Sequence, residues 1–221
     1  MVVQNRPGAG GAIGLAAAAR AQTDGYNLYL AATTNQAIAA AIYPKQEVSL
    51  LKDFVPIGQV GFAPHALVVS ASLPIKSVGE LLAYLKEKPG TYNFASQGTG
   101  TLSHLESELF VASNQLDMMH IPYKGSAQAL PDVPTLTEAG VKNVVADNVF
   151  GLFAPKGVPT EVVATLSTAL EAVLADPGLK ASLAKQGSEV SYAAPQALGA
   201  TIAEEHRYWA GVVKTADIKP Q

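Results

Sequence analysis

Cysteine is absent from this chain of 221 residues. Its absence excludes disulfide bonds, zinc ribbons and catalysis by a thiol, and it suits an exported bacterial protein as well as a cytosolic one. The four histidines are scattered along the sequence, a pattern that predicts no metal site. No cofactor motif is complete either, so we expect no cofactor.

Charge and long apolar runs are also scarce. Charged residues make up 15% of the chain and the net charge is −3, which excludes the basic footprint of a nucleic-acid-binding protein. The longest apolar runs, Leu15–Ala19 and Ala37–Ile42, are far shorter than a bilayer-spanning helix. Val2–Gln4 follows Met1 without the basic start and apolar core of a signal peptide. We therefore expect a mature or trimmed chain, or one that is not exported.

The stretch Phe94–His104 combines a strand, a turn and a helix start. Tyr92–Ala95 has the aromatic and small residues of a short strand, and a helix with one apolar stripe is predicted from Thr101 onward. Gly98 and Gly100 lie between them, where glycine permits a sharp turn and a close approach to a ligand. The order strand, glycine turn, helix is typical of a ligand-binding loop.

Hydroxyl side chains line this turn beside the unpaired amides of a helix start; they are Ser96, Thr99, Thr101 and Ser103. A helix N-terminus stabilises an exposed negative group by about 0.3–1 kcal/mol, and each charge-assisted hydrogen bond adds about 1.5–3 kcal/mol. The turn is therefore a candidate site for a carboxylate or phosphate without any arginine. The alternative is that Thr101 or Ser103 only caps the helix.

Two further segments are candidates for ligand contact. The polar group Thr33, Thr34, Asn35 and Gln36 follows a predicted strand at Asn27–Ala32, at what we expect to be the carboxyl edge of a parallel sheet. The alternative is that Thr34 or Asn35 is only the N-cap of the next helix. Tyr123 is a possible hydrogen-bond donor, and Lys124 a possible partner for an anion, although lone lysines are usually solvated.

Two catalytic or cofactor interpretations are weak. The turn with Gly8 and Gly10 lacks the third glycine of a dinucleotide fingerprint, since Ile13 stands there. Ser96 lacks the glycine two residues earlier that a serine-hydrolase elbow requires, and a histidine such as His65 or His120 would have to approach it. We expect a protein that is not an enzyme, with a hydrolase as the less favoured alternative.

Alternating and periodic patterns predict the remaining elements. They are a strand end at Val2–Val3, a helix at 12–21, strands at Ile57–Phe62 and Ala66–Ser70 separated by Pro64, a helix capped by Ser77, and a strand at Met118–Ile121. A helix from Ser126 is cut short by Pro131, short pieces follow at 135–139 and 144–146, and a strand is expected at Val149–Ala154. Three helices, beginning near Pro159, Pro177 and Pro195, close the chain.

Several blocks of residues, in the order in which they occur, resemble those of the substrate-binding receptors of tripartite tricarboxylate transporters, also called Bug receptors. The blocks are Asn5–Gly11, Asp24–Tyr26, Lys52–Phe54 with Pro56–Gly58, Asn93–His104, His120–Gly125, Pro131–Thr135 with Glu138–Gly140, and Gly151–Pro155. Together they extend over nearly the whole chain.

The resemblance implies an α/β fold of the type II periplasmic-binding-protein class, with two lobes that close on a ligand. Residues 1–95 and 155–221 are expected to form the first lobe, and residues 96–154 the second. A small organic carboxylate and the membrane permease of the transporter are the expected partners, and the periplasm the expected location. The ligand-binding residues implied are Thr33, Thr34, Asn35, Ser96, Gly98, Thr99, Gly100, Thr101, Ser103 and Tyr123.

Compared with the family, the chain begins after the first strand and its ligand-gripping loop, and second-lobe elements are absent where Leu130 meets Pro131. Such a fold is incomplete and exposes sheet edges and apolar faces. We therefore expect a homo-oligomer, completed by dimerisation or domain swapping. The alternative function is a shortened, non-binding remnant or engineered derivative whose main property is self-association.

Overall fold

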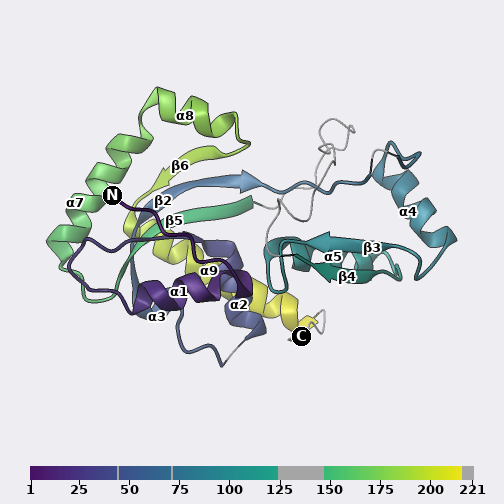
Figure 1. Ribbon diagram of the computed structural model, residues 1–221, viewed down its shortest axis with the longest axis horizontal. Helices are drawn as coiled ribbons and strands as arrows, with labels where there is room; N and C mark the ends of the chain where they lie inside the picture. The colour runs from purple at the N-terminus through teal and green to yellow at the C-terminus, as the bar shows by residue number, and fades with distance from the viewer. Residues whose placement is uncertain (44, 71, 124–146, 216–221) are drawn as a thin grey trace. The chain divides into compact units, whose positions relative to one another are not determined.

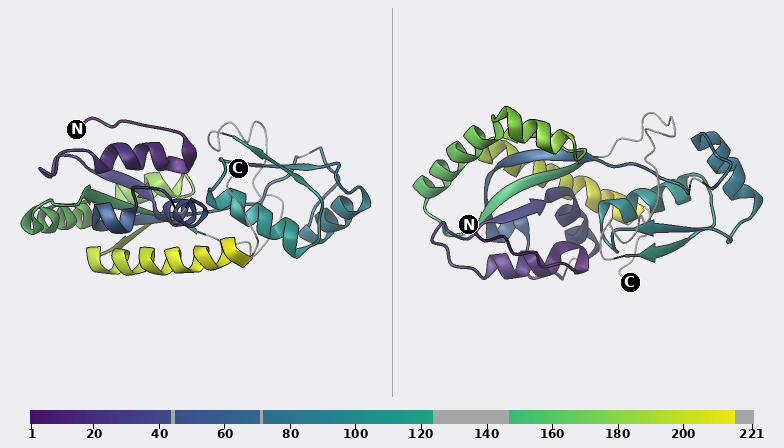
Figure 2. Two further views of the ribbon diagram at one scale, coloured as in Figure 1. Left: turned by 90° about the horizontal axis from the view of Figure 1, so that it is seen from below. Right: turned by 45° about the horizontal axis from the view of Figure 1, so that its top comes forward.

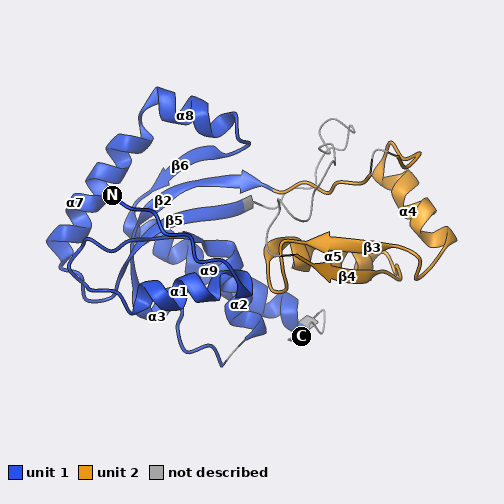
Figure 3. Cartoon of the chain, viewed as in Figure 1, with its two compact units in different colours: residues 1–64, 147–220 blue, residues 65–146, 221 orange. Residues whose placement is uncertain are grey.

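The computed structural model describes residues 1–43, 45–70, 72–123 and 147–215, which form parts of two compact units. Figure 3 shows unit 1, residues 1–64 and 147–220, and unit 2, residues 65–146. The chain passes from unit 1 to unit 2 after residue 64 and returns after residue 146. The lobe boundaries expected from the resemblance, at 95/96 and 154/155, lie later in the chain. The predicted strand at Tyr92–Ala95 therefore lies in the same compact unit as the turn that follows it.

Unit 1 contains a four-stranded sheet in the order β1-β5-β2-β6. The strands are β1 (Tyr29–Ala32), β2 (Phe54–Pro64), β5 (Asp147–Pro155) and β6 (Glu189–Ala193). Every neighbouring pair is antiparallel, and β5 lies between β1 and β2. Figure 1 shows β5 beside β2. The sequence predicts that β1 belongs to a parallel sheet, and this prediction is wrong. Strand β1 pairs with β5, a distant segment of the chain that runs antiparallel to it.

Strand β2 is longer than the sequence predicts. The two expected strands are one continuous strand that ends at Pro64, and residues 66–70 are not a strand. Pro64 has no N–H to donate to a ladder, and its register partner Asp147 is the first residue of β5, so pairing stops there for both strands. Val2 and Val3, expected as a strand end, are exposed and not paired.

Helices pack around this sheet and enclose its core. They are α1 (Ala12–Ala19) after the short η1 (Ala9–Gly11), α2 (Thr33–Ile42), α3 (Leu50–Asp53), α7 (Thr160–Leu174), α8 (Pro177–Ala184) and α9 (Pro195–Thr215). Figure 2 shows α9 running along the sheet, where it packs against β2 and α2. Phe153 of β5 is fully buried in a cluster that also includes Leu15, Phe54 and Leu198. The predicted helices at 12–21 and near Pro159, Pro177 and Pro195 are confirmed.

Unit 2 contains a parallel pair, β3 (Asn93–Ser96) and β4 (Met119–Pro122), with helices α4 (Val78–Glu87) and α5 (Leu102–Ser113). Helix α4 begins as predicted: Oγ of Ser77 accepts a hydrogen bond from N of Glu80 at 3.2 Å. The register pairs Phe94 with His120 and Ser96 with Pro122. The carboxyl ends of β3 and β4 are therefore side by side, which positions the turn after β3.

Several predictions fall outside the described residues. These are Lys124, the helix from Ser126, the junction of Leu130 with Pro131, and the pieces at 135–139 and 144–146. Within the described part of the chain, no single helix is both long and apolar enough to cross a bilayer. Helices α7 and α8 meet that criterion only as a pair, and the pair is bent by 71°.

Candidate functional site

The turn between β3 and α5 has the backbone that the sequence predicts. Gly98 has φ of +136° and Gly100 has φ of +78°, both in the region that favours glycine. A Cβ on Gly98 would also lie 3.1 Å from the carbonyl oxygen of Tyr123. The predicted strand, glycine turn and helix are confirmed, with Thr101 at the N-cap of α5.

The turn hydroxyls do not cap the helix in the ordinary way. Oγ1 of Thr101 donates to the carbonyl oxygen of Gly98 at 2.7 Å, and no side-chain hydrogen bond caps α5. Ser103 lies inside the helix, where its Oγ accepts from N of Gln97 at 3.1 Å. The interpretation of Thr101 or Ser103 as a simple cap is therefore wrong, since both hydroxyls tie the turn to itself.

Three backbone amides of the turn have acceptors within unit 2. N of Gln97 donates to Ser103 Oγ, N of Gly98 to Ser96 Oγ at 3.1 Å, and N of Gly100 to Nδ1 of His104 at 3.3 Å. A carboxylate that used these amides would have to replace those acceptors. Ser96 and Thr101 are also buried, with 2% and 4% of their surface exposed. The turn is thus preorganised, with its donors held by its own side chains.

Two histidine side chains, His104 and His120, contact the turn. Nε2 of His120 lies 2.7 Å from Oγ of Ser96, and the rings of His104 and His120 stack with centroids 4.1 Å apart. Burial, and to a smaller extent the charge of His120, lowers the pKa of His104 to about 4. Burial also lowers the pKa of His120. Both rings are therefore neutral at pH 7.

Sequence reasoning missed this histidine pair. His120 enters the site because β4 pairs with β3 across an intervening helix, a relationship that no local pattern reveals. The available signal was the spacing of His104 and Glu108, which puts the two side chains on one helix face. Nε2 of His104 lies 3.5 Å from Oε1 of Glu108, and burial raises the pKa of that carboxyl.

The contact between Ser96 and His120 resembles half of a hydrolase triad, but its details differ. The Ser96 hydroxyl has a second acceptor within reach, because its Oγ also lies 3.2 Å from the carbonyl oxygen of Gly98. The side chain is buried and not presented to a substrate. A serine nucleophile has to be open to its substrate, and the buried position of Ser96 does not meet that requirement.

Tyr123 joins the turn through its backbone. Its N–H donates to the carbonyl oxygen of Ser96 at 3.0 Å, while the residue keeps 39% of its surface exposed. Thr99, at the tip of the turn, is half-buried. Unit 2 therefore brings together the candidates that the sequence places after β3 and β4: Ser96, Gly98, Thr99, Gly100, Thr101, Ser103 and Tyr123.

The other candidates, Thr33, Thr34 and Asn35, lie in unit 1 and in a helix. They form the first turn of α2, whose N-cap is Ala32, so the prediction of a polar loop before the helix is wrong, and so is the alternative that Thr34 or Asn35 is the N-cap. Ala32 ends β1 in extended conformation and the chain turns directly into the helix. Oγ1 of Thr33 donates to the carbonyl oxygen of Val149 at 3.2 Å, which ties α2 to β5.

Thr34 connects the same turn to a buried carboxyl group. Its Oγ1 donates to Oε1 of Glu205 at 2.6 Å and accepts from N of Val149 at 3.3 Å. Burial raises the pKa of Glu205, while hydrogen bonds from Thr34 and Thr33 oppose that rise. Thr33 and Thr34 are almost fully buried, so their hydroxyls hold the framework of unit 1.

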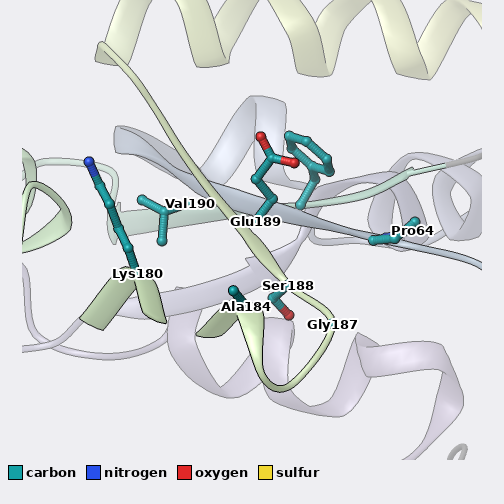
Figure 4. Close-up of a pocket in the computed structure, with 8 residues that line it drawn as sticks. Pro64, Lys180, Ala184, Gly187, Ser188, Glu189 and Val190 are labelled. Carbon is teal, nitrogen blue, oxygen red and sulfur yellow. The ribbon is translucent and has the colours of Figure 1, made fainter. Parts of the chain in front are cut away.

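A hollow on the surface of unit 1 lies among β2, α8 and β6 (Figure 4). It is lined mainly by Phe62, Pro64, Lys180, Ala184, Glu189 and Val190. Lys180 is exposed, and the side chains drawn in Figure 4 do not converge on one point. None of the candidate residues from the sequence lines this hollow.

Comparison with known families and proteins gives a consistent result. The family described as "Tripartite tricarboxylate transporter family receptor" matches residues 1–130 and 127–218. BugT of Bordetella pertussis is 31% identical over 261 aligned positions, which cover 99% of this chain and 80% of BugT. That alignment has at least 40 more positions than the 221 residues of the chain, so BugT carries segments without a counterpart here.

Solved structures share the fold. A protein described as a periplasmic transporter has a TM-score of 0.87 and 33% identity, over 99% of this chain and 87% of its own. Rpa4515 of R. palustris, solved with adipate, has a TM-score of 0.85 and 27% identity, over 100% and 87% of the two chains. MatC of Rhodopseudomonas palustris, solved with bound malate, has a TM-score of 0.79 and 26% identity, over 93% and 85%.

Proposed function

The chain belongs to the tripartite tricarboxylate transporter receptor family, and we propose that it binds a small organic carboxylate in the periplasm and delivers it to a membrane permease. The predicted family and its mixed α/β fold are thereby confirmed. The family consists of solute-binding receptors and not enzymes, so the hydrolase alternative is set aside.

The observation that carries the proposal is the ligand chemistry of proteins with this fold. Adipate and malate, found with two of the similar structures, are both small dicarboxylates. In this chain the turn of Ser96–Ser103 offers hydroxyls and amides at the start of α5, which is suitable chemistry for a carboxylate. Site residues on this turn, with Tyr123, remain part of the proposal, as do Thr33, Thr34 and Asn35 in unit 1.

Neutral donors suit a receptor that must release its ligand. Hydrogen bonds from amides and hydroxyls bind a carboxylate less strongly than a buried ion pair does. The internal acceptors of the turn add to this effect, because a bound carboxylate has to exchange with Ser96, Ser103 or His104 for the amides. We therefore expect reversible binding and little discrimination by charge alone.

Calorimetric titration with a panel of mono-, di- and tricarboxylates tests the proposal. We expect saturable heat with at least one small carboxylate and a weaker affinity for Ser103→Ala, which removes one of the hydroxyls that we propose as ligand contacts. Ser107→Ala is a matched control, since this hydroxyl lies one turn further along α5 and donates to the carbonyl oxygen of Ser103. Absence of heat and of thermal stabilisation with every member of the panel would refute the proposal.

The homo-oligomer remains a prediction, and no finding supports the alternative of a non-binding, self-associating remnant. Light scattering over a dilution series measures the oligomeric state directly. A mass above that of one chain of 22.9 kDa at all concentrations is expected, and a monomer that is insensitive to dilution would contradict it.

A further inference from the structure

His104 accepts a backbone hydrogen bond at the start of α5. Thr101 is the N-cap, so His104 is the third residue of the helix, and its Nδ1 accepts from N of Gly100 at 3.3 Å. In a capping box the third helical residue, usually Glu or Gln, accepts from a backbone amide at the helix start in the same manner. Histidine differs from those residues because one added proton removes its ability to accept.

The hydrogen bond fixes the position of the proton on the neutral ring. A backbone N–H can only donate, so Nδ1 of His104 carries no proton and Nε2 carries it. Nε2 lies 3.5 Å from Oε1 of Glu108. In the described part of the chain, the titratable groups that face the ring are Glu108 on the same helix and His120, which stacks on it from β4. A second proton on His104 can therefore go only to Nδ1.

Protonation of Nδ1 breaks the bond to Gly100. Two donors then face each other, and the N–H of Gly100 loses its acceptor. Both residues are buried, so bulk water does not readily replace that acceptor. A positive charge in the first turn of a helix is also unfavourable against the helix dipole. An anion that accepts from the Gly100 N–H beside the charged ring offsets both costs.

We propose that His104 is a positioning residue of the carboxylate site, where its neutral ring holds the Gly100 N–H in the ligand-free protein and its protonated ring releases that N–H to a bound carboxylate. This inference rests on the proposed function. Because coupling between two binding events is reciprocal, the carboxylate favours protonation of His104 as much as protonation favours the carboxylate. The site thus takes up a proton with its ligand.

The sign of the pH dependence follows from the free protein. Burial lowers the pKa of His104 to about 4, so the ring is neutral at pH 7 without ligand. A bound carboxylate raises this pKa, because an opposite charge favours the protonated ring. The affinity for the carboxylate therefore rises as the pH falls from 7 to 5. A coupling in the usual range of about 5–150-fold gives a rise of about 2–10-fold over this interval.

Calorimetry of matched variants tests the coupling. Malate, adipate and any other carboxylate of the panel that binds are titrated at pH 7, 6 and 5. His104→Asn keeps an oxygen that can accept from the Gly100 N–H but gains no proton. We expect the affinity of the unmodified protein relative to His104→Asn to rise by ~2–10-fold between pH 7 and pH 5. Titration of the ligand itself affects both proteins equally and cancels in this ratio.

His65→Asn is the control for the loss of a histidine from the same unit. Nδ1 of His65 contacts Oε2 of Glu106 at 2.8 Å, away from the Gly100 amide. This variant is expected to show the same rise in affinity as the unmodified protein. Loss of the rise in His65→Asn would assign the pH dependence to the wrong histidine and would overturn the proposal.

Nitrogen NMR of the imidazoles needs no variant and so does not depend on how the variants fold. In the ligand-free protein at pH 7, Nδ1 of His104 is expected to be unprotonated and the Gly100 amide to exchange slowly with solvent. With saturating carboxylate at pH 5, both ring nitrogens are expected to be protonated and the Gly100 amide signal to move.

The outcomes separate this inference from the function on which it rests. A proton on Nδ1 in the ligand-free protein at pH 7, or a constant affinity ratio between the unmodified protein and His104→Asn, would overturn the inference while carboxylate binding stands. Absence of binding by every carboxylate at all three pH values would instead refute the proposed function, and the coupling with it.

Discussion

Thr34 and Glu205 form a 2.6 Å hydrogen bond that joins the first turn of α2 to α9, and the second carboxylate oxygen of Glu205 is buried without a partner among the described residues. The bond satisfies half of a carboxyl group that burial has removed from water. A buried charge with incomplete hydrogen bonding is costly, so this carboxyl group tends to stay protonated.

The raised pKa of Glu205 predicts that the free energy of unfolding falls as the pH rises. The raised pKa means that the folded protein holds this proton more tightly than the unfolded chain, whose pKa is near 4.5. The resulting stabilisation is present below pH 4.5 and is lost as the pH rises through the folded pKa. Glu205→Gln, which stays neutral, is expected to remove this dependence. Urea unfolding of both proteins across pH 4.5–8 gives the difference, and parallel curves would contradict the prediction.

Thr34→Val tests the hydroxyl at the other end of the bond. The substitution keeps the shape of the side chain but leaves Oε1 of Glu205 and N of Val149 without this partner. We expect a loss of about 1–3 kcal/mol in the free energy of unfolding. Thr201→Val on α9 is the control, because its hydroxyl bonds only to a carbonyl of its own helix and a change within about 0.5 kcal/mol is expected. Equal effects of the two substitutions would show that the Thr34 bond is unimportant.

Gly98→Ala tests the turn. Its φ of +136° is strained for any L side chain, and the new Cβ would lie 3.1 Å from the carbonyl oxygen of Tyr123. A destabilisation of about 1–3 kcal/mol and weaker carboxylate binding are expected. Gly211→Ala in α9 has open space around its Cβ and should instead stabilise by about 0.5–1 kcal/mol. Thermal unfolding compares the two, and a neutral Gly98→Ala would argue against a constrained turn.

The lowered pKa of His104 predicts the opposite effect, a free energy of unfolding that falls as the pH falls. Its pKa of about 4 in the folded protein lies below the ordinary value of 6.5, so the unfolded chain binds this proton first. The protein should therefore lose stability as the pH falls from 6.5 towards 4. NMR titration of the imidazole signals measures the pKa directly, and a His104 signal that titrates near 6.5 would contradict burial of the ring.

Local signals in the sequence were sufficient for much of the fold. Ser77 and Glu80 mark the start of α4, and Gly98 and Gly100 mark the turn, because capping and positive φ depend on residues close in sequence. The same reasoning identified the strand before the turn and the helix after it. Periodicity also located α7 and α9, whose apolar faces are regular.

The pairing of segments that are distant in the chain could not be predicted from the sequence. Strand β5 is inserted between β1 and β2, so the antiparallel sheet could not be inferred from either neighbour. Thr33 and Thr34 are polar residues that read as a loop, but bonds to Val149 and Glu205 place them in a buried helical turn. His120 was one of two histidines named as able to approach Ser96, but the sequence could not choose between them, because His120 reaches Ser96 through the β3–β4 register.

The register of β2 and β5 shows where unit 2 is inserted into unit 1. Pro64 and Asp147 are partners in the ladder, so the chain leaves unit 1 and returns to it at adjacent positions. Unit 2 is thus an insertion into a hairpin whose two strands are already in register. Replacing it with a two-residue Asn-Gly turn would leave the strand order of unit 1 unchanged. Unit 2 is thus joined to unit 1 at one end of a single strand pair, and the order of the strands in unit 1 does not depend on it.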